Sequence, residues 1–221
     1  NSVGVRGFHL VPGEVIAAQI EVVCHDIGLQ AAKTGMLAAT EIIRAVAQAW
    51  RDHGSGVPLV VDPVCASMHG DPLLQPSALD SLRTELIPLA TLVTPNLHEV
   101  RLLVGVDVVD ADSQREAARA LHGLGPQWVL VKGGHLRPSD TSTDLLFDGT
   151  DFHKFDSLRV NTIHDHGAGD TLSTAVACAL AQGYPVPDAV AFGKLWVTEC
   201  LRAAYPLGHG HGPVSPLFRL L

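Results

Sequence analysis

Short apolar runs alternate with longer amphipathic segments along most of the chain, and this alternation restricts the fold more than any other feature. Residues 59–61, 91–93 and 128–131 are almost entirely apolar, as strands are when both faces of their sheet are covered. The segments between them carry apolar residues at helical spacing. We therefore expect an α/β fold, with a mainly parallel, doubly wound sheet and helices on both faces.

Caps and turn residues indicate where the individual elements begin and end. Thr40 is the expected N-cap of one helix, Ser113 and Glu116 match a capping box that opens another up to Leu121, and Asp188 is expected to open the last helix. Further expected elements are helices over residues 12–26, 77–86 and 167–182, a short strand over 31–36, and a hairpin of 145–147 and 152–155. The apolar face of the helix after Thr40 would consist of Ile42, Ile43, Val46 and Trp50.

Composition limits the classes of protein to which this chain can belong. Of its 221 residues, 47% are hydrophobic and 17% are charged, which excludes a disordered chain and allows a large buried core. No repeat, low-complexity tract or linker interrupts it, so we expect one domain over residues 1–221. The formal net charge of -8 argues against nucleic acid or an anionic membrane as the main partner and is compatible with small-molecule ligands. No run reaches the roughly 18 apolar residues of a membrane span.

The cysteines point to a reducing compartment. Cys24, Cys65, Cys178 and Cys200 show no metal-binding spacing, and no small secreted scaffold surrounds them. We therefore expect reduced thiols in a cytoplasmic protein. Cys178 is expected to pack in the core from within a helix, and Cys65 to pack in the core or a loop because nothing near it in sequence would activate a thiol.

Four polar clusters are expected at the carboxyl ends of the strands, where sheets of this kind collect their ligands. They are Asp62-Pro63 after one strand, residues 94–99 after the next, residues 132–135 after a third, and residues 166–170 just before a helix. Together they indicate a single site.

The strongest of these clusters is Gly167-Ala168-Gly169-Asp170, followed by an apolar, alanine-rich helix. Glycines let the backbone approach an anion closely, and the start of a helix adds a dipole that favours phosphate. A carboxylate at Asp170 can take the proton of an attacking hydroxyl while N–H groups hold charge on the transferred phosphoryl group. The segment therefore predicts a phosphoryl-transfer centre rather than an ordinary glycine-rich helix start.

The other clusters each have two readings. Asn96 and Glu99 are three residues apart, as ligands that hold Mg²⁺ directly or through water could be, but they also match a helix-capping box, and both readings can hold together. Lys132 comes just before two glycines, the second of which is Gly134. At this position the lysine could contact nucleotide phosphates or simply be solvated. Asp62 supports the metal region or only shapes a turn with Pro63.

The histidines do not form a convincing metal site. His164 and His166, and likewise His209 and His211, are clusters in short loops without a helical i, i+4 pair or cysteine partners. We interpret them as solvated loop residues.

The motifs together resemble the ribokinase superfamily. Thr-Pro-Asn-Leu-His-Glu at 94–99, Val-Lys-Gly-Gly-His at 131–135 and His-Gly-Ala-Gly-Asp-Thr-Leu-Ser at 166–173 occur in the order seen there. Lys-Thr-Gly-Met-Leu at 33–37 and Asp-Pro-Val-Cys-Ala-Ser-Met-His-Gly-Asp at 62–71 narrow the resemblance to the hydroxymethylpyrimidine/phosphomethylpyrimidine kinases of thiamine biosynthesis, especially their actinobacterial form. The resemblance covers residues 1–221.

This resemblance implies two successive phosphorylations that depend on ATP and Mg²⁺, first of the pyrimidine alcohol and then of its monophosphate. The resemblance implies that the pyrimidine pocket is lined by Met36 and Val64, and that ATP is bound by Lys132, Gly134, Thr94 and Asn96. It also implies that the metal is held by Glu99 and Asp62. The anion hole would consist of Gly167, Ala168 and Gly169, and the base would be Asp170. Homodimers are common in the family.

The chain departs from the family pattern in three places. Many members carry Cys where this chain has Asp170, a position where sugar and pyridoxal kinases carry Asp. The loop 161–166 is longer than usual. The first strand of the family and its glycine-rich segment precede the position of Asn1, and we expect roughly 45 residues to be missing, from the usual length of the family. A chain without them is expected to fold marginally or bind substrate poorly, because the neighbouring strand loses its pairing.

Two rival functions remain. Asp170 favours a pyridoxal or related vitamin kinase of the same superfamily. The expected missing segment favours an inactive module that binds a pyrimidine without phosphorylating it.

Overall fold

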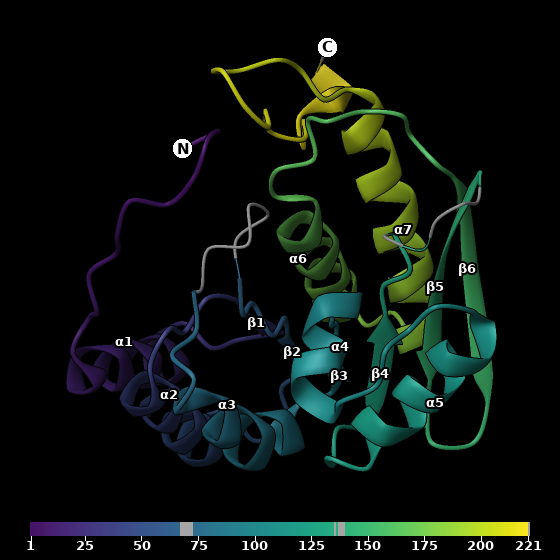
Figure 1. Cartoon of the computed structure of the whole chain (residues 1–221). Coiled ribbons are helices and arrows are strands. Elements are labelled where there is room, and N and C mark those ends of the chain that lie inside the picture. The colour runs from purple at the N-terminus through teal and green to yellow at the C-terminus, as the bar shows by residue number, and fades with distance from the viewer. Residues whose placement is uncertain (67–72, 135, 137–139, 221) are drawn as a thin grey trace.

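A computed structural model of the chain describes residues 1–66, 73–134, 136 and 140–220 (Figure 1). Six strands form one sheet in the order β1-β2-β3-β4-β5-β6. The strands are β1 (Ala32–Thr34), β2 (Leu59–Val61), β3 (Leu92–Val93), β4 (Trp128–Val131), β5 (Thr141–Phe147) and β6 (Phe152–Leu158). The first four are parallel, and β5 and β6 form an antiparallel hairpin that pairs with β4. The expected mainly parallel sheet is confirmed.

The helices cover both faces of this sheet, as expected. They are α1 (Gly13–Asp26), α2 (Thr40–His53), α3 (Ala78–Ser81), α4 (Leu97–Val104), α5 (Ala111–His122), α6 (Ala168–Ala181) and α7 (Val186–Arg202). A π-helical turn (Leu82–Leu86) continues α3, and 3-10 turns occupy Ile87–Leu89 and Phe218–Leu220.

Alternate residues of the central strands build two separate cores. Val61 of β2 and Val93 of β3 pack in the core that α2, α4 and α5 cover. Their neighbours Val60 and Leu92 point to the other face, into the core covered by α6 and α7, which lie side by side in Figure 1. Because successive side chains of a strand point to opposite faces, a continuously apolar strand is what a sheet covered on both sides requires.

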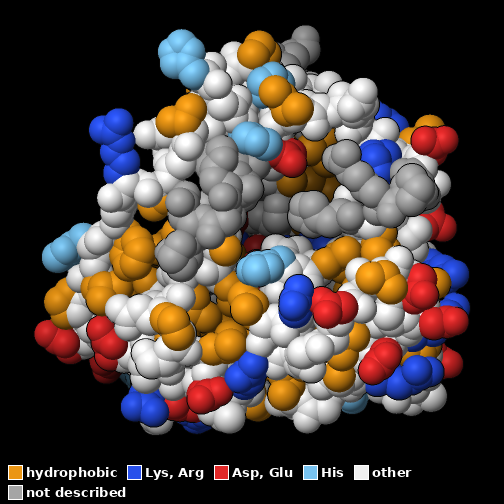
Figure 2. Space-filling view, in the orientation of Figure 1, with side chains coloured by type: hydrophobic (Ala, Val, Ile, Leu, Met, Phe, Trp, Pro, Cys, Tyr) orange, Lys and Arg blue, Asp and Glu red, His pale blue; other side chains and the backbone are white. Residues whose placement is uncertain are grey.

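Helix α1 is not part of the two layers that cover the sheet directly. Helix α1 packs on α2, and none of its residues is fully buried. Ile16 and Ile20 touch the core, whereas Val15 and Val23 are 44% and 37% exposed. Figure 2 shows apolar side chains gathered over the part of the surface where α1 and α2 lie.

Three expected helix starts are wrong, each for a local reason. Thr40 is not the N-cap of α2, because its hydroxyl donates to the carbonyl oxygen of Ser77 and Ala39 occupies the cap position. Ser113 does not open α5, because Asp110 is the N-cap and Ser113 is its N3 partner in the capping box. Asp188 lies inside the first turn of α7, which begins after Pro185.

Cys178 also differs from its expected place. It lies on α6 as predicted but is exposed, since the buried side of this helix carries Leu172, Val176 and Leu180. Cys65 is buried in the core, as expected. Within the described residues, no helix is both long enough and apolar enough to cross a membrane.

Candidate active site

Asp62, Thr94 and Lys132 meet at one edge of the sheet. They directly follow β2, β3 and β4, which are neighbours and parallel, so their carboxyl ends lie together. The N-terminus of α6 reaches the same edge, since Ser173 of α6 donates its hydroxyl proton to Oδ2 of Asp62 at 3.3 Å. The structure therefore unites the four polar clusters that the sequence indicated, apart from His135, which lies outside the described residues.

Asp62 is the centre of this arrangement. Its side chain is 2% exposed, and its Oδ1 accepts hydrogen bonds from Nζ of Lys132 at 3.0 Å and from the hydroxyl of Thr94 at 3.2 Å. Thr94 itself is fully buried. One carboxylate thus fixes the ends of three strands to the first turns of α6, a role that goes beyond the turn with Pro63.

Lys132 is not a solvated surface lysine, because its side chain is only 13% exposed. Burial opposes its positive charge, but the carboxylates of Asp62 and Glu99 outweigh this effect and raise its pKa above the ordinary value. The backbone of Lys132 is held as well, since its N–H donates to the carbonyl oxygen of Pro95 at 3.0 Å. The site therefore contains a fixed, charged ammonium group.

The turn before α6 lies against this ammonium group. Gly167 is the N-cap residue in the left-handed region, with φ +81°, a conformation that side chains disfavour. Ala168, Gly169 and Asp170 form the first turn, and a Cβ added at Gly169 would lie 3.3 Å from Nζ of Lys132. The glycine lets the start of the helix approach the lysine closely, which suits a site for a phosphoryl group.

Asp170 projects from this first turn and is 63% exposed. Its Oδ1 lies 2.8 Å from Nζ of Lys33, whose side chain is 21% exposed. Lys33 belongs to β1, and the glycine two residues later, Gly35, lies beside both charged groups. The motif at residues 33–37 carries part of the family resemblance, but its spacing does not indicate this pair, because Lys33 and Asp170 are 137 residues apart.

Asn96 and Glu99 form the capping box at the start of α4. The side chain of Asn96 accepts from the N–H of Glu99 at 2.9 Å, and the side chain of Glu99 accepts from the N–H of Asn96 at 2.7 Å. Glu99 is 3% exposed, and this burial, opposed by the charge of Lys132, raises its pKa to about 7. The capping interpretation is confirmed, and it places a carboxyl group that titrates near neutral pH beside Lys132.

Cys65 lies near this group without being activated. Burial and the nearby Glu99 raise the pKa of its thiol to about 12, and its Sγ donates to the carbonyl oxygen of Pro63 at 3.1 Å. The thiol is therefore protonated and inert at neutral pH, in agreement with a packing role.

A second buried ion pair supports the loop after β4. Lys194 of α7 and Asp144 of β5 lie 2.9 Å apart, with side chains 8% and 6% exposed. Asp144 also accepts from the N–H of Gly133 at 2.8 Å. The guanidinium group of Arg159 donates to the carbonyl oxygens of Gly134 and Leu136. These contacts hold the N–H of Gly133 and the carbonyl oxygen of Gly134, the two glycines that follow Lys132.

The sequence analysis did not predict the ion pair of Lys194 and Asp144, although two features of the sequence indicated buried charges. Lys194 interrupts the otherwise buried side of α7 formed by Val190, Gly193 and Val197, and Asp144 precedes the apolar run of β5. A charged residue in such a position is rarely buried without a partner.

Met36 and Val64 lie just beyond the ends of β1 and β2. Met36 is 40% exposed and Val64 is partly buried. Both therefore lie at the same edge of the sheet as Asp62. Residues 67–71 of the segment 62–71 are outside the described residues.

The loop histidines pair with the C-terminal segment. His164 accepts at Nδ1 from the N–H of Gly212 at 3.0 Å, and His211 lies 3.1 Å from Asp165. The backbone of His166 forms a parallel bridge with Pro213. These contacts attach the loop that precedes Gly167 to the end of the chain.

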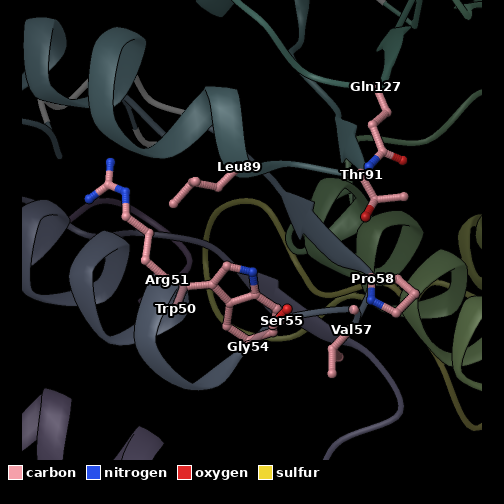
Figure 3. Close-up of a pocket in the computed structure, with 10 residues that line it drawn as sticks. Trp50, Arg51, Gly54, Ser55, Val57, Pro58, Leu89, Thr91 and Gln127 are labelled. Carbon is pink, nitrogen blue, oxygen red and sulfur yellow. The ribbon is translucent and has the colours of Figure 1, made fainter.

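A groove of about 440 Å³ lies elsewhere on the molecule (Figure 3). It is lined by residues that precede the strands, Pro58 before β2, Thr91 before β3 and Gln127 before β4, together with Trp50 and Arg51 of α2. It therefore opens at the opposite edge of the sheet from Asp62 and Lys132 and is separate from the candidate active site.

Comparison with known proteins identifies the family of the chain. The family model described as phosphomethylpyrimidine kinase matches residues 1–215. The hydroxymethylpyrimidine/phosphomethylpyrimidine kinase of Mycobacterium tuberculosis is 70% identical over 220 residues, which cover 100% of this chain and 80% of that protein.

Two solved structures share the fold. The ADP complex of Bacillus subtilis pyridoxal kinase has a TM-score of 0.87 and 34% identity, covering 96% of this chain and 79% of that one. The phosphomethylpyrimidine kinase of Clostridium difficile 630 has a TM-score of 0.78 and 34% identity, covering 90% and 80%. The fold is therefore ribokinase-like, and the chain belongs to the phosphomethylpyrimidine kinase family.

Proposed function

We propose that this kinase uses ATP to phosphorylate 4-amino-5-hydroxymethyl-2-methylpyrimidine, and then its monophosphate, to give the diphosphate for thiamine diphosphate biosynthesis. The observation that carries the proposal is the position of Asp170 in the first turn of α6, beside Lys33 and next to the turn that Lys132 contacts. The 70% identity to a kinase named for these two substrates supports the choice of substrate.

Asp170 acts as the general base in the first phosphorylation. Its exposed carboxylate can take the proton of the pyrimidine hydroxyl as the oxygen attacks the γ-phosphorus of ATP. The backbone of Gly167, Ala168 and Gly169 and the dipole of α6 hold the charge on the transferred phosphoryl group.

Residues at the ends of β3 and β4 serve the nucleotide. Lys132 is charged and fixed by Asp62, so it can neutralise phosphate oxygens without being reoriented. Gly134 and Asn96 border the same region, and Thr94 contributes through its hydrogen bond to Asp62. Met36, which follows β1, and Val64, which follows β2, line the pyrimidine pocket.

The residues present fit Mg²⁺ as an ion held through water. Asp62, Asn96 and Glu99 supply the oxygen atoms that Mg²⁺ prefers, but Oδ1 and Oδ2 of Asp62, Oδ1 of Asn96 and Oε2 of Glu99 each already accept a hydrogen bond from the protein. The ion, when bound, would neutralise charge on the ATP phosphates. Asp62 and Glu99 would hold its water shell.

Two broader expectations belong to the same proposal. The four cysteines are unpaired, which suits the reducing cytoplasm. A homodimer, common in the family, is the assembly that we expect.

The second candidate function is phosphorylation of pyridoxal, favoured by Asp170 and by the similarity to the pyridoxal kinase of Bacillus subtilis. A coupled assay of ADP release with hydroxymethylpyrimidine, its monophosphate and pyridoxal separates the two. We expect kcat/KM to be highest for the pyrimidines. A higher value for pyridoxal would reverse the assignment, and binding of the pyrimidine by calorimetry with no ADP release would indicate the non-catalytic module.

A further inference from the structure

Two ammonium groups flank the turn from Gly167 to Asp170. Lys132, at the end of β4, lies beside Gly169, and Lys33, on β1, lies 2.8 Å from Asp170. The sheet order β1-β2-β3-β4 places these lysines on different sides of the start of α6. Lys132 therefore faces the nucleotide side of the proposed site, and Lys33 faces the side of the acceptor.

The two ion pairs differ in how easily they can open. The partner of Lys132 is Asp62, which is 2% exposed and is also held by Thr94 and Ser173. The partner of Lys33 is 63% exposed, and Lys33 itself is 21% exposed. Exposed ion pairs contribute little to stability, so Lys33 can exchange Asp170 for a ligand at small cost, whereas Lys132 cannot leave Asp62 as readily.

The two phosphorylations make opposite demands on Asp170. In the first, the hydroxyl oxygen forms a bond to the γ-phosphorus, its proton passes to Asp170, and the bond from the γ-phosphorus to the β–γ bridging oxygen breaks, leaving its electron pair on ADP. In the second, a phosphate oxygen of the monophosphate makes the same attack. A phosphate monoester loses its second proton near pH 6, so at pH 7 to 8 no proton has to be removed, and the negative acceptor meets a negative carboxylate.

We propose that Lys33 is a specificity-determining residue for the second phosphorylation. Its ammonium group holds Asp170 when the acceptor is an alcohol and binds the acceptor phosphate when the acceptor is the monophosphate. Gly35 borders the place of this exchange, since a Cβ there would lie in ordinary contact with both groups, 3.5 Å from Nζ of Lys33 and 3.6 Å from Oδ1 of Asp170. The inference rests on the proposed function.

The test compares kcat/KM for the alcohol and for the monophosphate in Lys33→Met, Lys33→Arg and the wild type, with products identified by phosphorus NMR. A charged hydrogen bond to the acceptor phosphate predicts that Lys33→Met loses about ten- to a hundred-fold more activity on the monophosphate than on the alcohol. Lys33→Arg keeps the charge and should retain most of the activity on the monophosphate. Lys154→Met, which removes an exposed lysine of β6, is the matched control and should change neither value.

Equal losses on both acceptors in Lys33→Met would overturn the inference and leave Lys33 as a residue that only positions Asp170. Unchanged activity on the monophosphate would overturn it as well. A wild-type protein that phosphorylates neither acceptor would contradict the proposed function itself, so the two failures are distinguishable.

Discussion

Nζ of Lys132 and Oδ1 of Asp62 lie 3.0 Å apart in a position where both side chains are largely shielded from water. Removing one partner of such a pair leaves the other charge buried without compensation. Asp62→Asn should therefore lower the free energy of unfolding by roughly 3 kcal/mol and weaken binding of an ATP analogue, because Lys132 loses its anchor.

Urea denaturation and calorimetry measure these two effects. Asp112→Asn is the matched control, since Asp112 pairs with Arg115 at the surface and is 93% exposed. Its free energy of unfolding should change by no more than about 0.5 kcal/mol. If both variants behaved alike, the buried pair would have no special role.

Glu99 should make the stability of the protein depend on pH. Its pKa in the folded protein is raised from 4.5 to about 7, so the folded state binds the proton more tightly than the unfolded state. The resulting stabilisation is fully present below pH 4.5 and is lost as the pH rises through 7.

Glu99→Gln removes this titration while keeping an oxygen for the capping box. Only the wild type should lose the stabilisation by this proton as the pH rises. Relative to the wild type, the free energy of unfolding of the variant should therefore increase by on the order of 3 kcal/mol between pH 5 and pH 8. Chemical denaturation at the two pH values measures the change. A difference independent of pH would show that Glu99 titrates in the ordinary range.

The two glycines after Lys132 should respond differently to substitution. A Cβ at Gly133 would lie 1.9 Å from the carbonyl oxygen of Thr143, whereas the nearest atom to a Cβ at Gly134 is Oγ of Ser142 at 3.8 Å. Gly133→Ala forces β5 and the loop apart and should cost about 3 kcal/mol or more. The midpoint of thermal unfolding should fall by at least about 6 °C, while Gly134→Ala should shift it by less than about 2 °C. Similar midpoints for the two variants would mean that the loop is not packed as described.

The sheet and its two covering layers were predictable from the sequence, because a strand buried on both faces must be apolar at every position. Residues 59–61 and 128–131 show this pattern directly. Helix starts were less predictable. Asp110 and Ser113 can each open a helix, and the actual capping box uses both, with Asp110 at the cap.

The individual residues of the site were more predictable than the contacts between them. Glycines, Asp170 and Lys132 were identifiable because each follows a strand or opens a helix. Lys33 pairs with Asp170, which lies 137 positions away in the sequence, and Lys194 pairs with Asp144, which lies 50 positions away. Local spacing carries no information about such contacts.

The central claim is that Asp170 removes the proton of the pyrimidine hydroxyl, and Asp170→Asn tests it most directly. We predict that kcat with hydroxymethylpyrimidine falls by about 10²- to 10⁴-fold, while the affinity for an ATP analogue stays within about three-fold of the wild type, since Lys132 and the turn before α6 are unchanged. Asp188→Asn, which changes an exposed first-turn carboxylate of α7, should leave kcat unaltered. Near-normal kcat in Asp170→Asn would contradict the account.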